Sequence, residues 1–326
     1  MTKRKPYTST MHPRKSALRR LPAPLVALLF LAALAVSGCS RPAASGSAEG
    51  GSKAAPAASA ISPSGGEDVV AAESFLADIV RNVAGGRLLV GTLVPPETDP
   101  HEYQARPSDF ARIRNAKLFI VAGAGYEAWL QSAAGALEGV DVVSLFKDDG
   151  SGDPHFWTDP RNTAAALGGL VAALSKIDPA SAPLFEANAK RYAAELGALD
   201  ARIKARFAPI PPGRRLLLTN HDALGHFAAA YGFRLVGTVL PGSSTEAAPS
   251  AKGLSELLSA IKTSGAPAIF LDVGENKKIA DTVASEAKVK VVTDLYIEGT
   301  SASEGPAPTY IAMLDHDAEV IADALK

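Results

Sequence analysis

Cysteine is almost absent from this sequence. Cys39 is the only cysteine among 326 residues, so no disulfide can form within the chain. The sequence also has no excess of positive charge, because its 33 Lys and Arg are balanced by 34 Asp and Glu. No basic stripe with interleaved aromatic residues is present either. Nucleic acid is therefore not expected as a partner.

The apolar run over residues 21–36 is shorter than the about 20 residues that a membrane-spanning helix needs. Basic residues precede it, and it ends at Val36-Ser37-Gly38-Cys39. This ending resembles a bacterial lipobox, in which the chain is cut before the cysteine and the thiol is acylated. We therefore expect a lipoprotein signal peptide over residues 1–38 and lipidation at Cys39. The alternative is an ordinary secretory signal with a chance cysteine.

Large apolar side chains are scarce over residues 39–66, where Ala, Gly, Ser and Pro predominate. Such a segment buries too little surface to offset the entropy lost on ordering, so we expect a flexible tether. The remaining residues, 67–326, are enough for two modest domains.

Short apolar runs alternate with longer helical patterns through these residues, which is typical of parallel sheets in an α/β fold. The expected strands are 69–72, 88–94, 118–121, 140–145, 216–219, 234–239, 268–272 and 289–293. The expected helices are 74–83, 108–115, 162–175, 223–231, 250–263, 277–287 and 309–325.

One further helix is much longer than the others. It is expected over residues 182–208 and ends at a group of prolines. It divides the strands into two groups of four. We therefore predict an α/β fold of two lobes, 67–181 and 209–326, each a mostly parallel four-stranded sheet flanked by helices, joined by this one rigid helix.

Three histidines follow expected strands. Ligands of open α/β sheets bind beyond the carboxyl ends of the strands, and His101, His155 and His221 all lie in such loops. Asp294 and Glu298 follow the last expected strand. Imidazole nitrogens with one carboxylate suit zinc, with manganese or iron as alternatives.

The other histidines lack this placement. His12 lies in the expected signal peptide, while His226 and His316 lie within helical patterns. We expect the latter two to be structural or surface groups.

Three ordered motifs resemble the metal-binding solute-binding proteins of zinc and manganese ABC importers. The first is LVPPETDPHEY at 93–103, followed by PSD at 107–109; the second is DPHFWTDP at 153–160; the third is TNHDAL at 219–224. The resemblance implies two α/β lobes joined by a long helix, with the metal in the cleft between them. It implies His101, His155 and His221 as ligands.

The resemblance also bears on the fourth ligand and on the metal. Aligning residues 305–310 with the family places Glu298 where an aspartate is usual, and Asp294 remains the alternative. His221 occupies a position where manganese-type members commonly carry glutamate, which favours Zn²⁺ over Mn²⁺ or Fe²⁺. The His-rich loop of many zinc-type members is missing from residues 147–152.

The expected function is capture of a divalent metal and its delivery to an ABC permease with its ATPase. The protein is expected to be a monomer anchored through lipid on the extracytoplasmic side of the membrane, in the periplasm or at the outer surface. Alternatives are a surface adhesin or metal chaperone with the same site, and a zinc-dependent hydrolase. We expect no enzyme, because Ala105 stands where the second histidine of a metalloprotease motif beginning at His101-Glu102 would lie.

Overall fold

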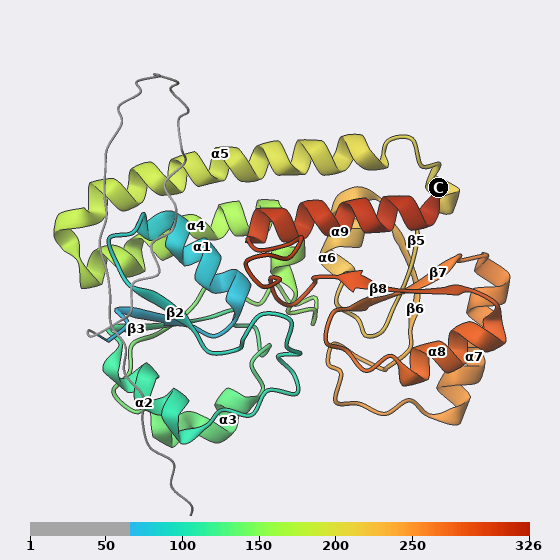
Figure 1. The fold of residues 1–326 in the computed structure, drawn as a ribbon, viewed down its shortest axis with the longest axis horizontal. Coiled ribbons are helices and arrows are strands. Elements are labelled where there is room, and N and C mark those ends of the chain that lie inside the picture. The colour runs from blue at the N-terminus through green and yellow to red at the C-terminus, as the bar shows by residue number, and fades with distance from the viewer. Residues whose placement is uncertain (1–65) are drawn as a thin grey trace, which may run out of the picture. The chain divides into compact units, whose positions relative to one another are not determined.

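The computed structural model describes residues 66–326 (Figure 1). The expected signal peptide, almost all of the expected tether and Cys39 lie outside these residues. Among the described residues, no helix combines the length and the apolar character that a membrane crossing needs.

A first lobe is built on a parallel sheet with the strand order β2-β1-β3-β4. Its strands are β1 (Val69–Ala71), β2 (Val90–Thr92), β3 (Leu118–Val121) and β4 (Val142–Ser144). The two central strands, β1 and β3, are apolar and buried along their whole length, as expected for parallel strands whose two faces are covered. The helices of this lobe are α1 (Ser74–Ala84), α2 (Pro107–Asn115), α3 (Trp129–Ala133) and α4 (Pro160–Ile177).

A second lobe repeats this design with the order β6-β5-β7-β8, again parallel. Its strands are β5 (Leu216–Thr219), β6 (Arg234–Thr238), β7 (Ala268–Asp272) and β8 (Lys290–Leu295). Its helices are α6 (Gly225–Tyr231), α7 (Ala251–Ser264), α8 (Lys278–Ala287) and α9 (Tyr310–Leu325). Short 3₁₀ turns complete the described chain: η1 (Ala134–Leu137), η2 (Phe156–Thr158), η3 (Pro179–Ser181) and η4 (Pro212–Arg214).

Helix α5 (Ala182–Phe207) connects the two lobes and packs on both (Figure 1). It contacts α1 and α4 of the first lobe, and α6 and α9 of the second. The buried residues Phe185, Leu196 and Phe207 lie along one side of it at helical spacing. They belong to one hydrophobic cluster that includes residues of both lobes, so α5 is part of a shared core.

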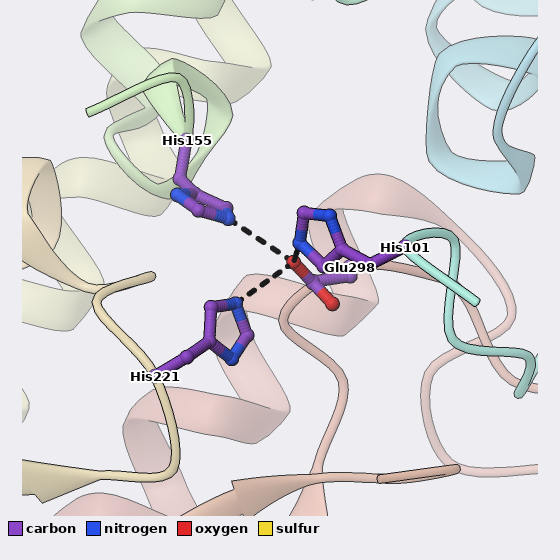
Figure 2. A group of neighbouring side chains, drawn as sticks. All are labelled: His101, His155, His221 and Glu298. Carbon is purple, nitrogen blue, oxygen red and sulfur yellow. Dashed lines mark hydrogen bonds and ion pairs between the residues drawn. The ribbon is translucent and has the colours of Figure 1, made fainter. Parts of the chain in front are cut away.

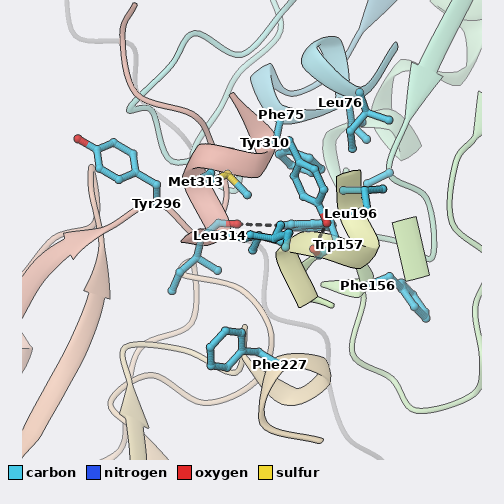
Figure 3. Packing of buried hydrophobic residues seen from close by; sticks show 14 of the residues in the cluster. Phe75, Leu76, Phe156, Trp157, Leu196, Phe227, Tyr296, Tyr310, Met313 and Leu314 are labelled. Carbon is cyan, nitrogen blue, oxygen red and sulfur yellow. Dashed lines mark hydrogen bonds between the residues drawn. The ribbon is translucent and has the colours of Figure 1, made fainter. Parts of the chain in front are cut away.

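Trp157 lies at the centre of this shared core (Figure 3). Its ring is fully buried and stacks on Phe75 of α1, with 4.5 Å between the ring centroids. Its indole N–H donates to the carbonyl of Ile297 in the second lobe over 2.7 Å. A buried tryptophan needs such a partner, and here the bond joins the two lobes.

The predicted architecture is confirmed: two parallel four-stranded sheets are joined by one long helix. Two details differ. Helix α3 was not expected, because a helix of only five residues gives little sequence signal. Strand β8 ends at Leu295 and not at residue 293, so Asp294 lies inside the strand and not after it.

Candidate metal centre

His155 follows β4 and is fully buried. The carboxylate of Asp153, two residues earlier, accepts the backbone N–H of His155 over 2.9 Å and lies 2.8 Å from its Nδ1. This contact places the Nδ1 proton toward Asp153 and leaves Nε2 available as a ligand atom.

His221 follows β5 and is arranged in the same way. Its Nδ1 lies 2.8 Å from Oε1 of Glu275, in the loop after β7. Glu275 is itself held in place, because its other oxygen accepts the backbone N–H of Asp272 over 2.7 Å. The Nε2 of His221 therefore also faces away from its carboxylate partner.

Glu298 lies three residues beyond β8, and its backbone N–H donates to Oδ2 of Asp272 over 2.6 Å. Its side-chain Oε1 lies 2.8 Å from Nε2 of His101 and 3.1 Å from Nε2 of both His155 and His221 (Figure 2). The four ligand atoms are all within 4.8 Å of one another. The first lobe supplies His101 and His155, and the second lobe supplies the other two.

This donor set has the geometry of a small cation site. Zinc bonds of ~2.0–2.1 Å place the corners of a tetrahedron about 3.3 Å apart, close to the spacing around Glu298. The second carboxylate oxygen of Glu298 is buried and has no hydrogen-bond partner among the described residues. A buried carboxylate oxygen without a donor is costly, so the site fits a ligand that carries positive charge.

The pKa values show that the cluster is electrostatically coupled. Burial opposes charge on His221, but Glu298 and Glu275 raise its pKa well above the ordinary value. Burial likewise opposes charge on His155, while contacts with Asp153 and Glu298 raise its pKa. Burial also opposes ionisation of Glu298, yet the histidines hold its pKa well below the usual range. These shifts favour protonated imidazoles beside an ionised Glu298, so the cluster favours positive charge at the position where a metal ion would bind.

A second layer of buried groups surrounds the cluster. The ring of Tyr126 packs edge-on against His101 and His155, with centroid separations of 5.1 and 5.5 Å. Glu73 is buried nearby, and burial, together with the charge of Glu127, raises its pKa well above the ordinary value. The raised pKa favours the uncharged form of Glu73, whereas the lowered pKa of Glu298 favours negative charge on the carboxylate that faces the imidazoles.

The structure does not bring every candidate residue to this site. Asp294 is exposed in β8, and its backbone carbonyl lies 2.9 Å from Nε2 of His316. His226 lies 3.1 Å from the carbonyl of Asp153 and packs on Phe156. Neither His226 nor His316 is part of the cluster, and both have local packing roles.

Sequence reasoning missed carboxylates that hold the ligand residues, among them Asp153, Asp272 and Glu275. Asp153 is two residues before His155, and Asp272 is the last residue of β7. Their positions beside a candidate ligand and at a strand end could have identified both as residues that support the site. Glu275 lies 54 residues from His221, and no local pattern links the two.

Residues 69–324 match the family described as zinc-uptake complex component A, periplasmic (ZnuA). The chain belongs to this family. Its members are metal-binding substrate-binding proteins of ABC importers and not enzymes. The resemblance found in the three sequence motifs is thereby confirmed.

Individual relatives carry the names of different metals. The manganese-binding lipoprotein MntA of Halalkalibacterium halodurans is 32% identical over 269 residues, which cover 80% of this chain and 89% of that protein. The iron-binding protein YfeA of Yersinia pestis is 28% identical over 265 residues, or 78% of this chain and 85% of that protein. The solved structure of the periplasmic zinc-binding protein TroA from Treponema pallidum matches with a TM-score of 0.74 and 28% identity, covering 80% of this chain and 99% of that one. Family membership therefore identifies a metal-binding transport protein but not its metal.

Proposed function

We propose that this ZnuA-family protein captures Zn²⁺ with His101, His155, His221 and Glu298 and delivers it to an ABC permease and its ATPase. One observation carries the ligand assignment: Oε1 of Glu298 lies within 3.1 Å of Nε2 of all three histidines. The ligands come from both lobes, so bound metal would hold the lobes together.

The donor set supports zinc. Three imidazole nitrogens and one carboxylate make a closed four-coordinate site, as in binding sites that have no open position for a reacting water. Asp153 and Glu275 orient His155 and His221 and increase their basicity. Manganese prefers harder oxygen ligands and higher coordination, and here only one carboxylate reaches the centre of the cluster.

Manganese or iron is the second candidate. The names of MntA and YfeA support it, and so does one feature of the site. Oε2 of Glu298 is free of hydrogen bonds among the described residues, so a two-oxygen binding mode would give five-coordination. Competition between metals separates the two candidates.

The location follows from the same proposal. Relatives named as lipoproteins or periplasmic proteins support an extracytoplasmic location. We extend this to a signal peptide over residues 1–38, a lipid at Cys39, a tether to residue 66 and a monomeric binding protein on the outer side of the membrane.

The function is tested with the detergent-purified full-length protein. Metal content after purification without added metal, followed by competition titrations of Zn²⁺ against Mn²⁺ and Fe²⁺, should show zinc bound most tightly. Retention of manganese or iron in the presence of equimolar zinc would contradict the choice of metal.

Histidine variants test the ligand set. His101→Ala, His155→Ala and His221→Ala should each weaken zinc binding severely, because each removes one of four ligands. The matched controls His226→Ala and His316→Ala should bind like the wild type. If His226→Ala weakens binding as much as His155→Ala does, the site is misplaced.

A further inference from the structure

The loop that carries His101 is held by the opposite lobe. His101 belongs to the first lobe, in the connection between β2 and α2. The carboxylate of Asp99 is 8% exposed; its Oδ1 accepts the backbone N–H of His101 over 2.9 Å. Its Oδ2 accepts the hydroxyl of Thr245, in the second lobe, over 2.7 Å. One carboxylate thus joins a candidate ligand to a residue on the other lobe.

Thr245 lies in the connection between β6 and α7, which contains none of the four candidate ligands. Its neighbours Ser244 and Glu246 line a cavity of about 840 Å³ together with His101 and Trp129. The residues on either side of Thr245 therefore form part of the wall of the cavity beside His101.

Other contacts hold the same loop through backbone atoms. The backbone N–H of Glu97 donates to the carbonyl of Thr300 over 3.2 Å. Gly274 packs so closely against the Glu97 carbonyl that a Cβ would lie 2.9 Å from that oxygen. These contacts hold the backbone of the loop at Glu97. The bond between Asp99 and Thr245 holds the loop again two residues before His101.

We propose that Thr245 is a positioning residue that acts through Asp99 to hold His101 against the metal, and so sets how long the metal stays bound. This inference rests on the proposed function. Without the Thr245 hydroxyl, Oδ2 of Asp99 loses this hydrogen bond. None of the four ligand residues is changed. His101 then leaves the metal more often, and the remaining three ligands retain it less well.

Metal dissociation rates test this role. The zinc-loaded full-length protein is mixed with excess chelator, and zinc release is followed by stopped flow. Thr245→Val, which keeps the shape but removes the hydroxyl, should speed release up to about tenfold, the low end of the losses found when a group bonded directly to a ligand is removed, because Thr245 acts through Asp99. Thr245→Ser retains a hydroxyl and should restore slow release. The matched control is Thr282→Val on the exposed face of α8, where the hydroxyl bonds only within its own helix.

Two further measurements separate positioning from a general structural effect. The thermal unfolding of metal-free Thr245→Val should show only the small loss expected for one hydrogen bond, and Thr245→Val should not alter the secondary structure. In a double-mutant cycle, adding Thr245→Val to Asp99→Ala should cause little further change, since the Thr245 hydroxyl acts on His101 only through the Asp99 carboxylate. Additive effects of the two substitutions would overturn the inference.

The outcomes also separate this inference from the proposed function. If Thr245→Val releases zinc at the wild-type rate while His101→Ala loses zinc, the positioning role is wrong and the metal site stands. Failure of Thr245→Ser to restore slow release overturns the positioning role as well. If His101→Ala binds zinc like the wild type, the proposed ligand set itself is wrong.

Discussion

Glu275 and His221 lie 54 residues apart in sequence, yet Oε1 of Glu275 is 2.8 Å from Nδ1 of His221. Both side chains are almost fully buried, with exposed fractions of 2% and 1%. The charge of Glu275 also raises the pKa of His221, against the effect of burial. Glu275 therefore fixes the orientation of the imidazole and makes its Nε2 a better electron donor.

The first prediction concerns this contact. Glu275→Gln keeps the size of the side chain and an acceptor oxygen but removes the charge. Zinc affinity should fall about ten- to a hundredfold, as is usual for carboxylates behind a ligand histidine. Zinc titration measures this loss. Glu286→Gln, on the exposed side of α8, should have wild-type affinity; equal affinity of the two variants would show that Glu275 has no role.

Much of the fold was predictable because the sheets are buried. Residues 118–121 and 268–271 are continuous apolar runs, which form the whole of the buried strand β3 and the first four residues of the buried strand β7. Strand β8 was less clear because it lies at the edge of its sheet. Thr293 and Asp294 are exposed there, so the apolar pattern stops before the strand does.

The site was predictable only in part, for a related reason. The three histidines follow buried strands, so topology alone indicated that they converge. The choice of Glu298 came from a motif that lies after it in sequence, not from spacing. The contacts of Glu275 with His221 and of Thr245 with Asp99 join loops far apart in the chain, and they become visible only when both lobes are folded.

A second prediction concerns the expected anchor at Cys39, which lies outside the described residues. Cys39→Ala removes the thiol that would be acylated, so the protein should leave the membrane fraction. Metal binding should remain intact, because the cluster lies wholly within residues 101–298. Fractionation of cell envelopes measures the first effect and zinc titration the second. Ser40→Ala is the control, and membrane retention of the Cys39 variant would reject lipidation.

The third prediction is that zinc affinity increases with pH across the imidazole range. The pKa values of His155 and His221 are raised in the metal-free protein, chiefly by neighbouring carboxylates acting against burial. Both shifts favour the protonated rings, and a cation binds only to the deprotonated ones, so binding releases protons. Competition titrations between about pH 6 and about pH 8.5 should show tightening with each step. A flat profile would mean that no histidine proton is displaced.

The stability of the metal-free protein should change in the opposite direction over the same range. A histidine whose pKa is raised on folding contributes stability that is fully present below its unfolded pKa of about 6.5. This contribution is lost as the pH rises through the folded pKa. The lowered pKa of Glu298 contributes above its unfolded pKa of about 4.3, so it is constant over this range. Thermal unfolding of metal-free protein should therefore show a melting temperature that falls as the pH rises.

The last prediction tests the fourth ligand. Glu298 is 2% exposed and its Oε1 touches all three histidines, whereas Asp294 is exposed in β8. Glu298→Gln removes the charge that neutralises the cation, so zinc affinity should fall by more than the ten- to hundredfold typical of an indirect contact. Asp294→Asn changes a solvated group outside the cluster and should leave the affinity near that of the wild type. Zinc titrations of the two variants rank them directly. A greater loss of zinc affinity in Asp294→Asn than in Glu298→Gln would reverse the assignment. Such a result would mean that Asp294, in the edge strand β8, faces the metal in place of the buried Glu298.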